Sequence, residues 1–398
     1  MDAERESYLE RAAVKLEQHT AKYGIGTWKG SIHYFLWNLS QLFRCTRRMR
    51  PKNDDCIRIA FILKGGLGDQ LMSLNFIQNL DQYIDCQHEI DVCTSHRKGT
   101  AMLETFCSGQ AFVRKVVDST RLDRSYDCVV SMVRMPKIVY WNEQKIARLS
   151  PKFSDYCKSV TQFAQANAML YRSSTQADAI AMGLTRFMGR NRLQQGDVNG
   201  ILGVKSIFSL CPQADSSKVL ACFELQGIRY ITIQRGVGGP VGNASTRNWP
   251  LANYTALVRM INEKYPDLPV IQLGVTQAEL IHGTHDLRGK TNLTELMILL
   301  KCSCCHIDID GGQVHMRHFL QGKPSVVLFG PTSDEFLGYS ENINIRVSAC
   351  QGPCEWLTAD YEKNCIKGTR ECMNSITPSC VFSSVEKLLA GELQNVTE

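Results

Sequence analysis

The chain has 398 residues, of which 44% are hydrophobic and 21% charged, which is the composition of a globular protein and excludes a disordered one. Its length favours two domains over one. The net charge of +6 suits anionic small molecules or an anionic membrane surface, but it is too small to indicate a nucleic-acid-binding protein.

The amino terminus and the cysteines indicate the cellular compartment. Residues 1–6 lack the basic start and apolar run of a secretory signal, and no apolar stretch of about 18 residues is present that could span a membrane. The 17 cysteines are odd in number, and many lie in apolar runs. Because such cysteines behave as small hydrophobic residues in a reducing environment, we expect a cytoplasmic protein, either free or peripheral on the inner membrane face.

Residues 1–55 are predicted to form a helical extension. Apolar residues between Ile32 and Phe43 recur at helical spacing, and basic residues between Arg44 and Lys52 follow them. Two interpretations fit this pattern. The helix contacts an anionic membrane surface, or it packs on the rest of the protein or on a partner subunit.

From Cys56 onward, short apolar strands alternate with helices, which predicts parallel sheets covered by helices. The predicted strands are 57–63, 89–94, 128–133, 230–234, 269–273, 305–309 and 325–329, and the predicted helical stretches include 153–188, 251–264 and 294–301. A weakly patterned stretch, 196–209, is the candidate linker. The predicted domains are therefore 56–205 and 206–398, and the second carries a cysteine-rich segment at 350–380.

The first predicted strand ends in a glycine-rich turn, Gly65-Gly66-Leu67-Gly68-Asp69. Glycines at such a turn let a ligand approach the backbone and point the amino terminus of the next helix at it. The turn lacks the spacing of a dinucleotide fold and the lysine of a P-loop, and it presents a carboxylate instead. Asp69 is either a functional carboxylate or an acid that only stabilises the start of the helix.

Arg247 follows the predicted strand 230–234 and precedes a helix that opens at Pro250. Its guanidinium group is suited to binding a diphosphate. The alternative is an ordinary surface arginine.

The predicted strand 305–309 also ends in a glycine turn, Asp310-Gly311-Gly312, with His315 one turn into the next helix. Ligands bind at such strand ends in open α/β sheets. The amides of Gly311 and Gly312 suit a phosphate, and Asp310 suits a sugar or ribose hydroxyl. His315 either contacts a phosphate, orients Asp310 or has a structural role.

Four cysteines are closely spaced near the carboxyl end: Cys350, Cys354, Cys365 and Cys372, followed by Cys380. Their spacing suits a tetrahedral zinc or iron site, although it departs from a pair of C-x2-C motifs. The other interpretation is free thiols in a surface loop.

Taken in order, these motifs resemble glycosyltransferase family 9, the heptosyltransferase-like bacterial enzymes. The resemblance extends over about 57–390. The segments that carry it are 65–69, 247–250, 287–293, 310–315 and 324–332.

The resemblance implies two Rossmann-like domains facing a cleft, which is the GT-B fold, and inverting transfer of a sugar from a nucleotide-sugar donor, commonly ADP-heptose. Asp69 would be the general base, with Gly66 and Gly68 in the loop on the acceptor side. The implied donor-binding residues are Arg247, Gly274, Asp310, Gly311, Gly312, His315 and Thr332. The family often has lysine at the position of Arg247, which keeps the charge but changes the geometry of phosphate binding.

No catalytic metal is implied, and the Asp308-Ile309-Asp310 run is not interpreted as a metal site. Some family members that glycosylate bacterial autotransporter proteins carry iron at cysteines in this region. The resemblance therefore implies structural iron or zinc at the four cysteines. The acceptor would be a lipopolysaccharide-type saccharide or a protein hydroxyl, and a homo-oligomer is also compatible.

Two other functions remain as alternatives. A sugar-nucleotide epimerase of the GT-B type would need a second acid near the anomeric carbon. A non-catalytic scaffold subunit would use the amino-terminal helix and the cysteines for assembly.

Overall fold

The computed structural model describes residues 55–94, 99–117, 122, 125–132, 134–171, 175–204, 207–236, 245–350, 352–358 and 360–394. The helical extension predicted for residues 1–55, with its membrane and partner interpretations, lies outside these residues except at its last position. Of the helices within the described ranges, none is long and apolar enough to cross a membrane.

The first sheet has five strands in the order β3-β2-β1-β4-β5. They are β1 (Ile57–Leu63), β2 (His88–Thr94), β3 (Lys115–Val116), β4 (Cys128–Met132) and β5 (Pro136–Trp141). The central strand β1 pairs in parallel with β2 and β4, and it is largely buried because helices cover both faces. The antiparallel β5 was not predicted, since it begins with proline and is mostly half-exposed.

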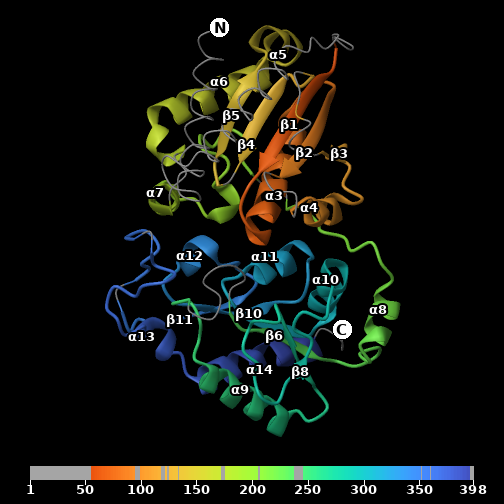
Figure 1. Ribbon diagram of the computed structural model, residues 1–398, viewed down its shortest axis with the longest axis vertical. Helices are drawn as coiled ribbons and strands as arrows, with labels where there is room; N and C mark the ends of the chain where they lie inside the picture. The colour runs from red at the N-terminus through yellow and green to blue at the C-terminus, as the bar shows by residue number, and fades with distance from the viewer. Residues whose placement is uncertain are drawn as a thin grey trace, which may run out of the picture.

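Helices of this half occupy the upper part of Figure 1, with α6 and α7 on the left and α4 on the right. They are α3 (Leu67–Tyr83), α4 (Thr100–Cys107), α5 (Glu143–Leu149), α6 (Pro151–Ala166) and α7 (Thr175–Phe187), with short 3-10 turns η3 (Ala168–Tyr171) and η4 (Arg192–Gln194). The mainly helical stretch predicted over 153–188 corresponds to α6, η3 and α7.

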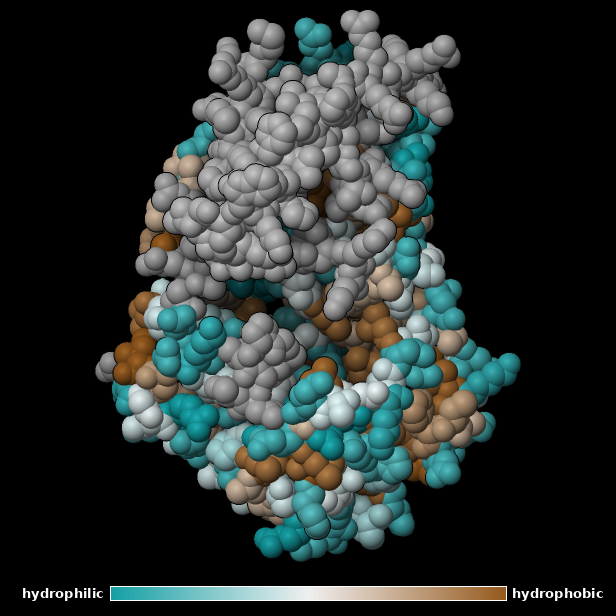
Figure 2. Space-filling view, in the orientation of Figure 1, coloured by the Kyte–Doolittle hydropathy of each residue, from teal (hydrophilic) through white to brown (hydrophobic). Residues whose placement is uncertain are grey.

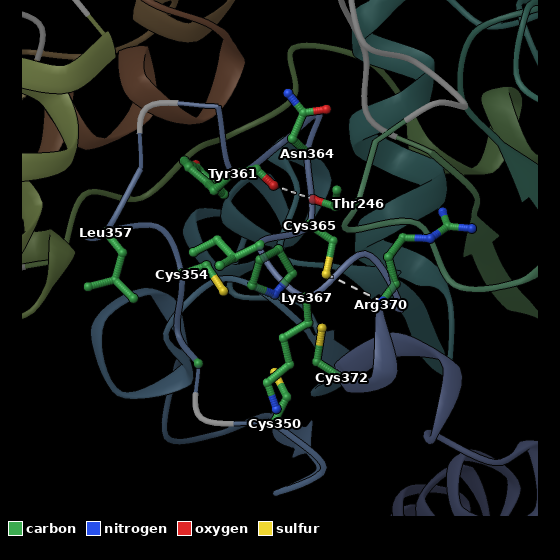
Figure 3. A pocket seen from close by; sticks show the side chains of 13 residues that line it. Thr246, Cys350, Cys354, Leu357, Tyr361, Asn364, Cys365, Lys367, Arg370 and Cys372 are labelled. Carbon is green, nitrogen blue, oxygen red and sulfur yellow. Dashed lines mark hydrogen bonds between the residues drawn. The ribbon is translucent and has the colours of Figure 1, made fainter.

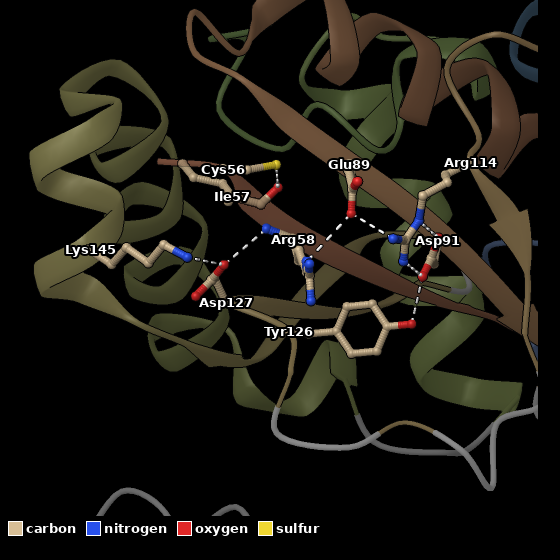
Figure 4. A network of polar contacts seen from close by, with 9 residues as sticks. All are labelled: Cys56, Ile57, Arg58, Glu89, Asp91, Arg114, Tyr126, Asp127 and Lys145. Atoms are coloured by element: carbon tan, nitrogen blue, oxygen red, sulfur yellow. Dashed lines mark hydrogen bonds and ion pairs between the residues drawn. The ribbon is translucent and has the colours of Figure 1, made fainter. Parts of the chain in front are cut away.

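A polar network fixes the amino ends of these strands, away from the ends where the glycine turns lie (Figure 4). Arg114 donates to the buried Asp91 through Nε at 2.8 Å and to Glu89 at 2.6 Å. The Tyr126 hydroxyl also donates to Asp91, at 2.7 Å. Because these partners join β2 to the segments beside it, the network has a structural role.

The second sheet has six strands in the order β11-β10-β9-β6-β7-β8, and all neighbours are parallel. They are β6 (Ile231–Gln234), β7 (Val270–Leu273), β8 (His285–Asp286), β9 (Cys305–Ile309), β10 (Ser325–Phe329) and β11 (Ile343–Arg346). The edge strands β8 and β11 were not predicted because they are short and carry polar residues. The other four strands lie within a residue of their predicted positions.

The second half also contains seven helices within the described residues (lower part of Figure 1). They are α8 (Ser216–Cys222), α9 (Leu251–Lys264), α10 (Leu293–Cys302), α11 (Gly312–Phe319), α12 (Asp334–Leu337), α13 (Glu371–Asn374) and α14 (Pro378–Gln394).

The connection between the halves is packed rather than loose. Phe208, within the predicted linker 196–209, has its ring centroid 5.9 Å from Phe112 and 5.5 Å from Phe319, which belong to different halves. The Leu210 amide donates to the Phe319 carbonyl at 2.7 Å. The linker therefore contributes apolar packing at the junction.

The amino ends of α3 and α11 meet where the two halves join, and glycine makes this contact possible. A Cβ atom at Gly68 would lie 2.6 Å from Cδ2 of His315, and one at Gly312 would lie 3.2 Å from Cδ2 of Leu67. On the face seen in Figure 2, the lower half exposes both hydrophilic and hydrophobic residues.

This contact predicts that Gly68→Ala is destabilising, by about 1–3 kcal/mol, because the added methyl group overlaps His315. Gly66→Ala is the matched control, since a Cβ at Gly66 meets nothing within 4 Å. Denaturant unfolding of both variants measures the difference. Greater stability of Gly68→Ala than of the wild type, as helix propensity alone would predict, would contradict the described contact.

Candidate active site

Asp69 lies in the first turn of α3, directly after the glycine turn. Its Oδ2 accepts the Gly66 amide at 3.1 Å, so the carboxylate does stabilise the start of the helix. Gly65 has φ +92°, and a Cβ there would lie 2.4 Å from this carboxylate oxygen. The turn therefore requires glycine at 65 in order to hold the carboxylate, whose side chain remains 28% exposed.

The other oxygen of Asp69 pairs with Arg192, which sequence reasoning did not identify. Nη2 of Arg192 lies 2.6 Å from Oδ1 of Asp69, and Arg192 itself is buried. Burial acts to raise the pKa of Asp69, but Arg192, Arg134 and the Gly66 amide outweigh it and hold the pKa below its usual value. Asp69 is therefore ionised at neutral pH.

Arg192 was missed because it lies 123 positions from Asp69 in a polar stretch with weak patterning. The available signal was local. Asn191 and Gln194 form a capping box around η4, which indicates a fixed backbone at this point. Nothing in that signal identifies Asp69 as the partner.

His315 faces the same junction from α11. Its Nδ1 lies 2.7 Å from the Tyr339 hydroxyl, and burial, reinforced by the charge of Arg192, lowers the pKa of His315 to about 3. The histidine is therefore neutral at neutral pH. Its described contacts are with Tyr339 and Gly68, so the structural interpretation of His315 has direct support.

Arg247 and Asp310, two of the implied donor-binding residues, contact each other. Nη1 of Arg247 lies 3.3 Å from the Asp310 carbonyl and 3.4 Å from its Oδ2. Nη2 lies 3.0 Å from Glu362 Oε1. Burial acts to lower the pKa of Arg247, but the two carboxylates outweigh it and hold that pKa above its usual value. Burial raises the pKa of Asp310, against the opposing effect of Arg247.

The remaining predicted donor residues lie at neighbouring strand ends. Gly311 is the N-cap of α11, and a Cβ on it would lie 3.2 Å from the buried Asp308. Gly274 directly follows β7, close to Gln234. Thr332 follows β10 and is fully buried. Burial raises the pKa of Asp308 well above its usual value.

Glu355, from the cysteine-rich segment, supports the turn that carries Thr332. Its Oε1 accepts the Ser333 amide at 2.9 Å, and the Cys354 amide donates to the Pro331 carbonyl at 2.7 Å. Burial raises the pKa of Glu355 to about 8. Sequence reasoning missed Glu355 because its position beside a cysteine gives no signal for this contact.

The four predicted cysteines line one cavity of about 150 Å³. Figure 3 shows Cys350, Cys354, Cys365 and Cys372 arranged around the same space. Within the described part of the chain the cysteines are free thiols, and no group of three or more His, Cys, Asp or Glu side chains is placed to hold a metal ion. The four thiols thus line the same cavity, but their sulfur atoms are not positioned to coordinate a metal ion.

Residues 239–368 match the sequence model of Glycosyltransferase family 9 (heptosyltransferase). This range contains Arg247, the Asp310 turn and three of the four cysteines. The resemblance predicted from the motifs is therefore confirmed for this segment. A comparison with curated protein sequences finds no match.

Three solved structures share the fold. A family 9 glycosyl transferase from Veillonella parvula DSM 2008 is 13% identical, with TM-score 0.54 over 86% of this chain and 100% of the other. The ADP-heptose LPS heptosyltransferase II of E. coli is 16% identical, with TM-score 0.52 over 84% and 99%. The iron-containing dodecameric glycosyltransferase TibC of enterotoxigenic E. coli H10407 is 14% identical, with TM-score 0.54 over 86% and 78%.

These comparisons confirm the predicted GT-B architecture of two α/β halves. Together with the family match, they support the prediction that the chain is a sugar-transferring enzyme, a glycosyltransferase.

The state of His315 predicts a pH-dependent stability. In the unfolded chain its pKa returns to about 6.5, so the unfolded state binds the proton more tightly than the folded state does. The free energy of unfolding should therefore fall as the pH decreases from about 6.5 towards 3. His315→Gln should reduce this loss, as measured by denaturant unfolding at pH 7 and pH 4.5. If the variant loses as much free energy of unfolding between pH 7 and pH 4.5 as the wild type, a group other than His315 binds the proton.

Proposed function

We propose that the protein is an inverting glycosyltransferase that transfers heptose from ADP-heptose to an acceptor hydroxyl. One observation carries the proposal. The ionised Asp69 and the Arg247–Asp310 pair come from different sheets and lie on the two sides of the α3–α11 junction. The named activity of E. coli heptosyltransferase II, which has the same fold, supports ADP-heptose as the donor.

In the proposed reaction, Asp69 takes the proton of the acceptor hydroxyl while its oxygen attacks the anomeric carbon. The bond between that carbon and the diphosphate breaks, and the negative charge develops on the leaving group. Arg247 and the backbone amides of Gly311 and Gly312 are placed to stabilise this charge. Within this proposal, the first domain (56–205) holds the acceptor and the second (206–398) holds the donor.

The charges around Asp69 favour an acceptor that carries phosphate or carboxylate groups. Arg192 and Arg134 both act on Asp69. Lys64 directly follows β1, and Lys137 lies on β5. An anionic lipopolysaccharide-type saccharide matches these surroundings better than a neutral protein hydroxyl does. A homo-oligomer and peripheral membrane contact remain predictions.

Asp69→Asn tests the base. The amide keeps the shape of the side chain but cannot take a proton, so transfer should fall by about 10²–10⁴-fold while nucleotide binding is retained. Sugar transfer and calorimetric nucleotide binding are measured on the same preparation. Transfer at the wild-type rate would disprove the role of Asp69.

We further propose that Cys350, Cys354, Cys365 and Cys372 hold a structural zinc or iron ion. The fit rests on four thiols lining a single cavity, because tetrahedral thiolate sites are the common arrangement for both metals. Small side-chain movements would have to bring the sulfur atoms to about 2.3 Å from a zinc ion. The bound ion would crosslink the segment 350–372.

Metal analysis of the purified protein is expected to find one zinc or iron per chain. Cys354→Ser combined with Cys372→Ser should remove it and lower the melting temperature. Cys222→Ser, at an exposed position in α8, is the control and should retain the metal. Protein purified without chelators and under reducing conditions that still lacks both metals would refute the site.

A further inference from the structure

Arg247 has two carboxylate partners that differ in their exposure to solvent. The side chain of Asp310 is 2% exposed, and that of Glu362 is 36% exposed, while that of Arg247 is 15% exposed. Asp310 therefore supports the guanidinium group from the interior, at the end of β9. Glu362 contacts it from the accessible side, from which a ligand would arrive.

A buried guanidinium group needs an anionic partner because leaving its charge uncompensated is costly. Among the described residues, the Nε atom of Arg247 has no hydrogen-bond acceptor, and the carboxylates that compensate its charge are Asp310 and Glu362. A diphosphate presents the same kind of paired, negatively charged oxygens, which arginine binds in a bidentate manner. Glu362 and a diphosphate therefore compete for one face of Arg247.

The backbone that carries Glu362 is held independently of its carboxylate. The Thr246 amide donates to the Glu362 carbonyl at 2.8 Å, and the Thr246 hydroxyl donates to the Tyr361 carbonyl. Thr246, which precedes Arg247, thus holds the backbone of Tyr361 and Glu362. Because these bonds hold the backbone, we expect Glu362 to leave Arg247 by rotation of its side chain.

We propose that Glu362 occupies the position of the donor diphosphate on Arg247 in the donor-free protein, and that the donor displaces it towards solvent. This inference rests on the proposed function only in that Arg247 binds the diphosphate. Each ligand anion must then break an existing ion pair before it binds. Glu362 thereby weakens the binding of anions to Arg247. Singly charged anions gain less binding free energy from displacing Glu362 than a diphosphate does.

Glu362→Gln is the direct test, with inorganic pyrophosphate as the probe because it makes no assumption about the nucleotide base. The variant keeps the size of the side chain and removes its charge. Calorimetry should show pyrophosphate bound about two- to fivefold more tightly, which is the range expected for breaking a partly exposed ion pair. Glu362→Asp, which retains the charge, should bind like the wild type.

Glu263→Gln on α9, where the side chain is 69% exposed, controls for the change in net charge and should leave binding unchanged. Weaker pyrophosphate binding by Glu362→Gln would show that Glu362 positions Arg247 instead, and it would overturn the inference. An equal gain in Glu263→Gln would also overturn it. Arg247→Gln separates the two proposals. If this variant binds pyrophosphate as tightly as the wild type, Arg247 does not bind the diphosphate and the proposed donor site is rejected. If it loses pyrophosphate affinity, the donor site is supported, independently of the result for Glu362.

Discussion

The contact between α3 and α11 determines most of what this molecule can do. The helices that follow β1 and β9 meet at Gly68 and His315, and a Cβ atom at residue 68 would overlap the His315 side chain. The contact brings the ends of β1 and β9 together. In the proposed reaction, Asp69 acts from the first half and the Arg247–Asp310 pair from the second, so neither half provides the site alone.

The pKa values of the acids in this region are shifted in opposite directions by their surroundings. Asp69 has a lowered pKa because Arg192 and Arg134 outweigh its burial. Asp308 and Asp310 have raised pKa values because burial dominates. The lowered pKa keeps Asp69 ionised at neutral pH, as a general base must be, and this makes Asp69 the candidate base.

The cysteine-rich segment contacts the proposed donor side of the site. Cys354 and Glu355 hold the turn at 331–333 through hydrogen bonds. Glu362, from the same segment, pairs with Arg247. The cavity lined by the four thiols lies between these contacts and includes Thr246 in its wall. A metal ion that crosslinks this segment would therefore stabilise the donor side without taking part in the chemistry.

The sequence by itself determined the strands β1, β2, β4, β6, β7, β9 and β10, because buried parallel strands require continuous apolar runs, and it determined the glycine turns at their ends. The gathering of the four cysteines was also predictable, since short spacing confines them to one region. The short or half-exposed strands β3, β5, β8 and β11 were not predicted. Only the tertiary structure decided that Arg192 pairs with Asp69 and that Glu355 and Glu362 enter the donor side. Those contacts join residues 22 to 123 positions apart within the same half. The loop packing that brings them together leaves no periodic pattern in the sequence.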